Sequence, residues 1–123
     1  MNREIKFRGQ QINTKKWVYG YLYRNKGLYV ICENIRYAEE EPIFLDTVGQ
    51  FTGLHDKNGK EIWENDIVEI KEKGINKKGV ITWENGCFFV KTKEYCLPLY
   101  DLLDYEIKVI GNITDNLELL GGK

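Results

Sequence analysis

The chain has 123 residues, of which 42% are hydrophobic and 30% are charged, and its formal net charge is −1. This length predicts one domain, or a small domain with an appendage, that can bury a core without disulfide staples. The near-neutral net charge gives no global field that would favour nucleic acid or a membrane surface.

The charges are nevertheless segregated along the chain. Residues 1–30 carry seven Lys/Arg and one Glu, whereas residues 31–66 carry three Lys/Arg and nine Asp/Glu. Oppositely charged segments most simply attract each other within the fold or between subunits. The pattern predicts self-association into a closed homo-oligomer, a dimer or a slightly larger ring. A basic binding face is the alternative interpretation.

Short alternating apolar runs dominate the chain, and no long 3.6-residue period occurs. With eight Tyr, three Trp and five Phe, the composition favours strands. Pro42 and Pro98 lie outside the runs, as a strand assignment requires, and one helical turn is predicted over residues 97–104. The predicted strands cover residues 4–8, 16–24, 28–33, 47–51, 67–72, 79–84, 87–92 and 106–113.

Residues 16–24, KWVYGYLYR, place four aromatic side chains on one face of a predicted strand, flanked by cations. An aromatic row beside cations is typical of platforms that bind single-stranded nucleic acid. The more ordinary interpretation is packing in a core or at an interface between subunits. The candidate contact residues here are Lys15, Lys16, Trp17, Tyr19, Tyr21, Tyr23 and Arg24.

The acidic run Glu39-Glu40-Glu41 is predicted to be a solvated loop. Farther along, Asn58-Gly59 and Asn85-Gly86 each lie between apolar segments. Asn-Gly between strands is the strongest short signal for a hairpin, because both central residues of a type I′ turn need positive φ. Tight turns with glycine at positive φ are therefore expected at both places.

The segment 47–70 combines the single histidine, His55, with several carboxylates. Asp56 and Asp66 are expected to cap turns through local bonds to the backbone, and Asn65 is a candidate for a left-handed residue. The chain contains no serine, and no cysteine lies near His55 in sequence, so a nucleophile–His–acid set is not expected. The carboxylate spacing does not match a calcium loop. The sequence predicts no enzyme, no metal site and no cofactor.

Residues 66–92 resemble half of a small SH3-like barrel, with a strand, a basic loop, a strand, an Asn-Gly turn and a strand. The loop at 71–78 is predicted to be basic, and its candidates for contact with phosphate are Lys73, Lys77 and Lys78. An ordinary solvated turn is the alternative.

The three cysteines, Cys32, Cys87 and Cys96, are odd in number and show no CxxC spacing. They are predicted to be free thiols rather than disulfide or zinc ligands. The opening MNREIKFRGQQ has no apolar region typical of a signal peptide, and no apolar run is long enough to span a membrane. These features favour a reducing cytoplasm.

The central segment QFTGLHDKNGKEIWENDIV, residues 50–68, resembles the signature of the YopX family. The similarity extends to REIKFR at residues 3–8 and to VIGNITDNLELL at residues 109–120. Asn65 stands where the family usually has Gly, and Leu117 where it usually has Pro. The resemblance implies a β-rich fold and a gene carried by a bacteriophage or prophage, and it brings no catalytic residues.

Together these features predict an all-β protein with at most short helical turns. An N-terminal β region over residues 1–65 and an SH3-like β-barrel over residues 66–123 are expected to pack as a single compact unit. The predicted function is non-enzymatic binding through contacts with a host or phage protein or with nucleic acid. A structural, self-associating protein without a ligand is the second hypothesis, and an enzyme is the third.

Overall fold

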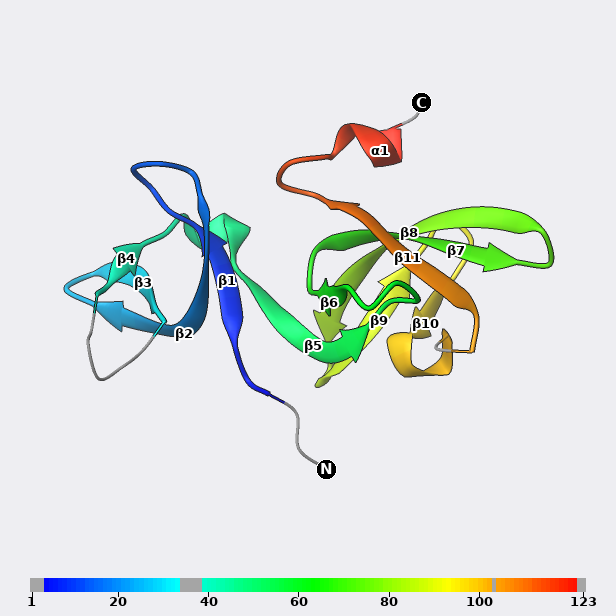
Figure 1. Ribbon diagram of the computed structural model, residues 1–123, viewed down its shortest axis with the longest axis horizontal. Coiled ribbons are helices and arrows are strands. Elements are labelled where there is room, and N and C mark those ends of the chain that lie inside the picture. The colour runs from blue at the N-terminus through cyan, green and yellow to red at the C-terminus, as the bar shows by residue number, and fades with distance from the viewer. Residues whose placement is uncertain (1–3, 34–38, 103, 122–123) are drawn as a thin grey trace. The chain divides into compact units, whose positions relative to one another are not determined.

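The computed structural model describes residues 4–33, 39–102 and 104–121, and most of their regular structure is antiparallel β-sheet (Figure 1). Helical structure within these residues is confined to the 3-10 turns η1 (Leu45–Thr47) and η2 (Leu99–Leu102) and to helix α1 (Glu118–Gly121). The prediction of an all-β protein with short helical turns is confirmed. The chain divides into two compact units, Met1–Phe51 and Thr52–Lys123.

The division falls 14 residues before the boundary at 65/66 that the sequence suggested. The physical reason lies in the side chains of the family motif. Ile62 belongs to the buried apolar cluster of the second unit, and Leu54 packs against the same cluster. These residues therefore belong with the strands that follow them.

The first unit is built on strands β1 (Phe7–Gln10), β2 (Trp17–Asn25), β3 (Leu28–Cys32) and β4 (Glu41–Pro42). They lie in the order β4-β3-β2-β1, and β1 also pairs with the start of β5 (Gly49–His55). Strand β2 pairs with β1 through Gly20 and with β3 from Tyr21 onward. The strand therefore changes partner at its middle, where Figure 1 shows it curving.

Two strands begin two or more residues later than predicted. The segment expected to pair from residue 4 forms β1 only from Phe7, and the segment expected from residue 47 forms β5 from Gly49. Thr47 lies instead in η1, where its hydroxyl donates to the Phe44 carbonyl at 2.6 Å and accepts from the Gln10 amide at 2.8 Å. This buried threonine satisfies polar groups at the end of β1, which strand pairing would otherwise have to satisfy.

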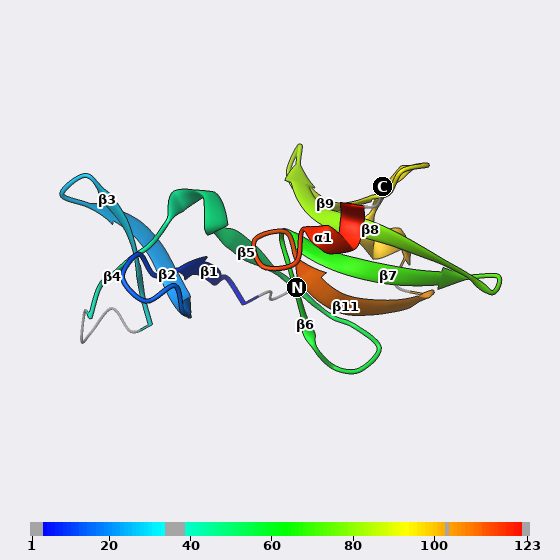
Figure 2. The ribbon, with the colours of Figure 1, turned by 90° about the horizontal axis from the view of Figure 1, so that it is seen from above.

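The second unit contains β6 (Glu61–Trp63), next to the end of β5, and a five-stranded antiparallel sheet. The sheet order is β10-β9-β8-β7-β11, and Figure 2 shows β7 between β8 and β11. Its strands are β7 (Asp66–Glu72), β8 (Ile75–Glu84), β9 (Cys87–Lys91), β10 (Cys96–Pro98) and β11 (Glu106–Asn112). The pairing of the described residues establishes an antiparallel sheet, and closure into a barrel stays a prediction.

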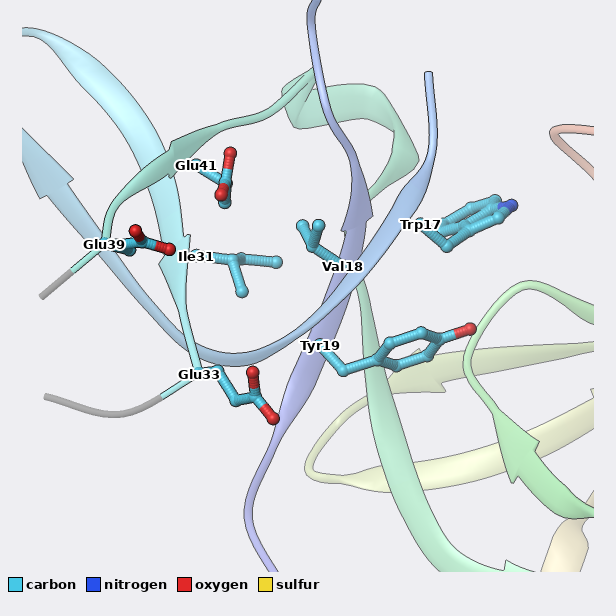
Figure 3. Close-up of a pocket in the computed structure, with 7 residues that line it drawn as sticks. All are labelled: Trp17, Val18, Tyr19, Ile31, Glu33, Glu39 and Glu41. Atoms are coloured by element: carbon cyan, nitrogen blue, oxygen red, sulfur yellow. The ribbon is translucent and has the colours of Figure 1, made fainter. Parts of the chain in front are cut away.

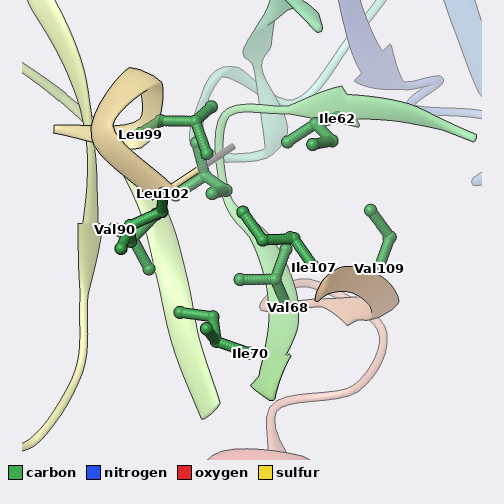
Figure 4. Packing of buried hydrophobic residues seen from close by; sticks show 9 residues of the cluster. Ile62, Val68, Ile70, Val90, Leu99, Leu102, Ile107 and Val109 are labelled. Atoms are coloured by element: carbon green, nitrogen blue, oxygen red, sulfur yellow. The ribbon is translucent and has the colours of Figure 1, made fainter. Parts of the chain in front are cut away.

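The core of the second unit is an aliphatic cluster drawn in Figure 4. Ile70 on β7 and Ile81 on β8 are completely buried, and Val90 on β9 is paired with Ile81. Because alternate residues of a strand point to opposite faces, these three side chains lie on the same face of the sheet. Leu99 and Leu102 from η2 also join the cluster, which includes Ile62, Val68, Ile107 and Val109.

Two-residue turns join several strands with both residues at positive φ. Asn85 and Gly86 have φ of 54° and 79°, as predicted. Lys73-Gly74 and Lys26-Gly27 adopt the same conformation, with φ of 52° and 80° and of 52° and 82°. The predicted basic loop over 71–78 is therefore wrong, because β7 and β8 continue up to a turn of only two residues. The turn was not predicted because Lys73 occupies the first position, where a type I′ turn usually has asparagine.

The Asn58-Gly59 turn has a different form from the one predicted. Gly59 has φ of 83°, as expected, whereas Asn58 lacks a positive φ. The Gly59 amide donates to the Asp56 carbonyl at 2.9 Å, and the Asp56 amide donates to the Lys60 carbonyl at 2.8 Å. The loop is therefore one residue longer than a type I′ hairpin, and the side chain of Asp56 organises it.

Both prolines lie inside short strands, contrary to prediction. Pro42 belongs to β4 and Pro98 to β10. Each of these strands ends its sheet order, so proline occupies an edge position where a missing N–H is tolerated. The helical turn predicted over 97–104 is confirmed only at η2, since Leu97 and Pro98 pair with β9.

The acidic run is also more ordered than a solvated loop. Glu41 lies in β4, and its carboxylate accepts a hydrogen bond from the side-chain amide of Gln11. The preceding Glu40 accepts from the Tyr23 hydroxyl at 2.6 Å and from the Asn25 amide at 2.8 Å. Its neighbours on β2 thus hold part of this acidic segment in place.

Candidate binding surface of the first unit

The aromatic row on β2 is divided between exposed and half-buried side chains. Tyr19 and Tyr21 are 45% and 49% exposed, whereas Trp17 and Tyr23 are half-buried. The row is therefore neither a closed core nor a fully open platform.

Gly20 separates the two exposed tyrosines and allows the strand to bend. Its φ is 151°, and a Cβ built there would lie 2.3 Å from the Cys32 carbonyl oxygen. Only glycine fits such a close approach of two backbones. The conformation at Gly20 thus determines how Tyr19 and Tyr21 are presented.

Each half-buried ring has a polar partner. The Arg8 guanidinium lies over the Trp17 ring, 4.9 Å from its centroid, and Arg8 itself is buried. The hydrogen bond that Tyr23 donates to Glu40, together with burial and the carboxylate charge, raises the pKa of Tyr23 to about 12. The same bond, with a second from Asn25, lowers the pKa of Glu40. These contacts fix the two ends of the row.

The predicted cations divide between the two units. Lys15 and Lys16 are exposed at the turn between β1 and β2, and the Arg24 guanidinium lies 5.4 Å from the centroid of the Tyr29 ring. In the second unit, Lys73 is exposed at its turn, and the Lys77 ammonium lies 5.1 Å from the centroid of the Tyr95 ring. The ammonium of Lys78 donates to the Leu119 carbonyl at 3.1 Å. Arg24, Lys77 and Lys78 thus have partners within the protein.

Two hollows open beside β2 within the first unit. One, here called the tyrosine hollow, has a volume of about 390 Å³ and is lined by Glu4, Ile5, Lys6, Tyr19, Gly20, Tyr21 and Glu33. Ile5 is 56% exposed, so an aliphatic side chain lies in the same depression as two exposed tyrosines. This combination of apolar and polar groups suits contact with the surface of another protein.

The second, here called the acidic hollow, has a volume of about 830 Å³ and is lined by Trp17, Val18, Tyr19, Ile31, Glu33, Glu39 and Glu41. Figure 3 shows Val18 and Ile31 on one side of β2 and the rings of Trp17 and Tyr19 projecting to the other side. The sequence analysis missed this arrangement. Glu33 carried no signal, and Glu39 and Glu41 were assigned only to a solvated run.

The other residues that the sequence analysis singled out have structural roles or lie exposed. Asp56 and Asp66 cap turns as predicted, with Asp66 Oδ2 accepting from the Trp63 amide at 2.7 Å. Asn65 has φ of 74°, as expected for a left-handed residue, and His55 is exposed at the end of β5. Cys32, Cys87 and Cys96 are free thiols in the structure.

Asp56 also has a role that the sequence did not suggest. Its carboxylate accepts from the amides of Asn58 at 2.8 Å and Lys60 at 2.9 Å, and from the Val109 amide on β11 at 2.9 Å. Burial alone would raise the pKa of Asp56. The three backbone donors and the charge of Lys60 outweigh burial and hold that pKa below its usual value. The motif loop is thereby joined to the edge of the sheet.

Two further properties of residues 4–33, 39–102 and 104–121 bear on function. Within these ranges no group of three or more His, Cys, Asp or Glu side chains is placed to hold a metal ion. No helix in the same ranges has the length and apolar character needed to cross a membrane.

The family described as YopX protein matches residues 6–121 of the chain. The chain belongs to the YopX family. No curated protein matches it. Among solved structures it is similar to the crystal structure of protein EF1440 from Enterococcus faecalis, with 24% sequence identity and a TM-score of 0.63. The similarity covers 98% of this chain and 100% of the other, and it concerns the fold alone.

Proposed function

We propose that this YopX-family chain is a non-enzymatic binding protein that recognises a partner protein through the tyrosine hollow. The observation that carries the proposal is the joint exposure of Tyr19, Tyr21 and Ile5 in one depression. Aromatic residues are enriched at protein interfaces, where their rings supply large contact areas and their hydroxyls supply hydrogen bonds.

Nucleic acid is the less favoured partner. Of the cations that sequence analysis assigned to phosphate contact, Arg24 and Lys77 lie over aromatic rings and Lys78 is bonded to a carbonyl. Among its described lining residues, the tyrosine hollow has Glu4 and Glu33 beside one cation, Lys6. Carboxylates at the mouth of a stacking site repel a phosphate backbone, which needs excess positive charge.

The proposal also covers the origin of the gene, the cellular location of the protein and the fold of the second unit. Membership of the YopX family supports a gene carried by a bacteriophage or prophage, and three free thiols support the reducing bacterial cytoplasm. The five antiparallel strands of the second unit support an SH3-like barrel there. A structural protein that only self-associates is the alternative function.

The test is site-specific photo-crosslinking in host cells from a probe at Tyr21, with a probe at Tyr100 as the control. Tyr100 is a matched tyrosine in the second unit and is 71% exposed. We expect a discrete partner to be joined at Tyr21 and not at Tyr100. The purified partner should then lose binding to the Tyr19→Ala/Tyr21→Ala variant while the melting temperature hardly changes.

Three outcomes would contradict this proposal. The first is equal crosslinking from both tyrosines. The second is unchanged binding of the purified partner by the double variant. The third is a salt-dependent complex with single-stranded oligothymidylate that the same variant abolishes, since it would favour nucleic acid instead.

A further inference from the structure

The acidic hollow combines an apolar floor with a negatively charged rim. Val18 and Ile31 project toward its interior, and the carboxylates of Glu33, Glu39 and Glu41 lie around them (Figure 3). The three carboxylates are not grouped closely enough for one metal ion, as judged for the described residues. Ile31 is only 1% exposed, so the half-buried Val18 and the rings of Trp17 and Tyr19 supply the apolar surface of the hollow. The arrangement suits an extended cation whose carbon chain packs against these side chains while its charged end reaches the rim, as lysine does.

The described residues that line the hollow supply no positive charge to its rim. No lysine or arginine is among its described lining residues. Glu41 accepts a bond from the neutral amide of Gln11, and Glu33 and Glu39 form no ion pair with any residue that the structure describes. Three like charges around one hollow attract a cation.

The same unit presents such a cation at the turn between β1 and β2. Lys15 and Lys16 are both exposed, and Lys15 has φ of 61°. The Lys15 amide donates to the Gln11 carbonyl at 2.8 Å, and the Gln11 amide donates to the Lys16 carbonyl at 2.9 Å. These bonds fix the backbone of the turn, so binding would have to order only the two lysine side chains.

We propose that the acidic hollow receives the Lys15-Lys16 turn of a second copy of this chain. Each copy carries both the basic turn and the acidic hollow. It can therefore insert its own turn into one neighbour and accept the turn of a neighbour in its own hollow. Two different patches that match in this way close either into a dimer with two equivalent contacts or into a small ring. The acidic hollow shares Tyr19 and Glu33 with the tyrosine hollow, whereas Tyr21 lines only the tyrosine hollow and Glu39 only the acidic one.

The test is sedimentation of the full chain at tens of micromolar in low salt, with charge-reversal variants. We expect the native chain to sediment as a defined oligomer. Lys15→Glu/Lys16→Glu and Glu33→Lys/Glu39→Lys should each weaken association roughly tenfold or more, because each places like charges opposite one another. Mixing the two variants in equal amounts should restore association, since the reversed charges are complementary again.

Matched controls separate this contact from a general effect of charge. Lys26→Glu changes another exposed lysine at a left-handed position of the same unit, and Asp46→Lys changes an exposed carboxylate of η1. Both should leave sedimentation unchanged. Tyr21→Ala should also leave it unchanged, because Tyr21 lines the tyrosine hollow and not the acidic one.

A native chain that sediments as a monomer would overturn the proposal. So would an oligomer that survives both charge reversals, one that the control changes also disperse, or a mixture of the two variants that stays dissociated. Each of these results leaves the recognition of a partner through Tyr19 and Tyr21 to be judged by its own crosslinking test.

Discussion

The two units of this protein bury apolar surface to different extents. Of the sixteen buried apolar side chains among the described residues, eleven lie in the second unit and five in the first. The first unit instead exposes Tyr19, Tyr21 and Ile5 and places three carboxylates around one hollow. Since buried apolar area drives folding, the second unit is expected to be the more stable of the two. The first unit is where surface remains available for contacts.

The largest effect is expected from emptying the core of the second unit. Ile81→Ala removes a completely buried side chain from the aliphatic cluster and should cost about 2–5 kcal/mol of unfolding free energy. Tyr21→Ala on the exposed row should cost no more than about 0.5 kcal/mol. Denaturant unfolding of both variants measures the contrast. Equal losses would show that the exposed row is packed as tightly as the core.

The next effect concerns the bond between the motif loop and β11. Asp56→Ala leaves three backbone amides without their acceptor and should cost roughly 2–3 kcal/mol, because buried donors lose their partner. Hydrogen exchange should show lost protection at Val109, with the amides of β1 and β2 unaffected. Loss of protection spread evenly over both units would mean that they unfold together.

The same carboxylate predicts a pH dependence. The folded pKa of Asp56 lies below its usual value of 3.8, so its contribution is fully present above that pH. The contribution is lost as the pH falls further through the folded pKa. Native protein should therefore lose stability in this acidic range by an increment that Asp56→Ala lacks. Parallel stability curves for the two proteins would contradict the assignment.

A smaller effect, local to the first unit, is expected at the bend of β2. Gly20→Ala places a Cβ against the Cys32 backbone and should cost roughly 1–3 kcal/mol, because the two strands must move apart. Gly27→Ala is the matched control, since it also has positive φ but nothing lies within 4 Å of its Cβ. The control should cost only about 1 kcal/mol. Equal costs at the two glycines would argue against the close approach of β2 and β3.

The smallest effect is expected at the turns of the second unit. Gly86→Ala should destabilise by about 1 kcal/mol, because a Cβ is disfavoured at a φ of 79°. Lys73→Asn should instead raise the free energy of unfolding by a few tenths of a kcal/mol, because asparagine tolerates a left-handed backbone better than lysine does. Thermal unfolding measures both. A neutral shift for Gly86→Ala would remove the backbone argument for that turn.

Local chemistry explains why much of the fold was predictable. Strand periodicity marked most of the strands, and Asn85-Gly86 marked its hairpin, because these signals depend only on neighbouring residues. Asp56 and Asp66 were identified as turn caps for the same reason, since their bonds to Asn58, Lys60 and Trp63 span only two to four positions. Prediction was poorer at Lys73-Gly74, where lysine at positive φ contradicts its usual preference and the strand pairing imposes the turn.

The sequence by itself determined the all-β class, the YopX family, the left-handed Asn65 and the aromatic row on β2. Each of these follows from residue type and short-range spacing. Only the tertiary structure decided that the units divide at 51/52, that Asp56 bonds to Val109 across 53 positions, and that the bend at Gly20 leaves two of the four rings exposed. The acidic hollow is likewise a feature that only the tertiary structure decided. Glu33, Glu39 and Glu41 surround Val18 and Ile31 because the sheet brings β2, β3 and β4 side by side, and no local pattern encodes that pairing.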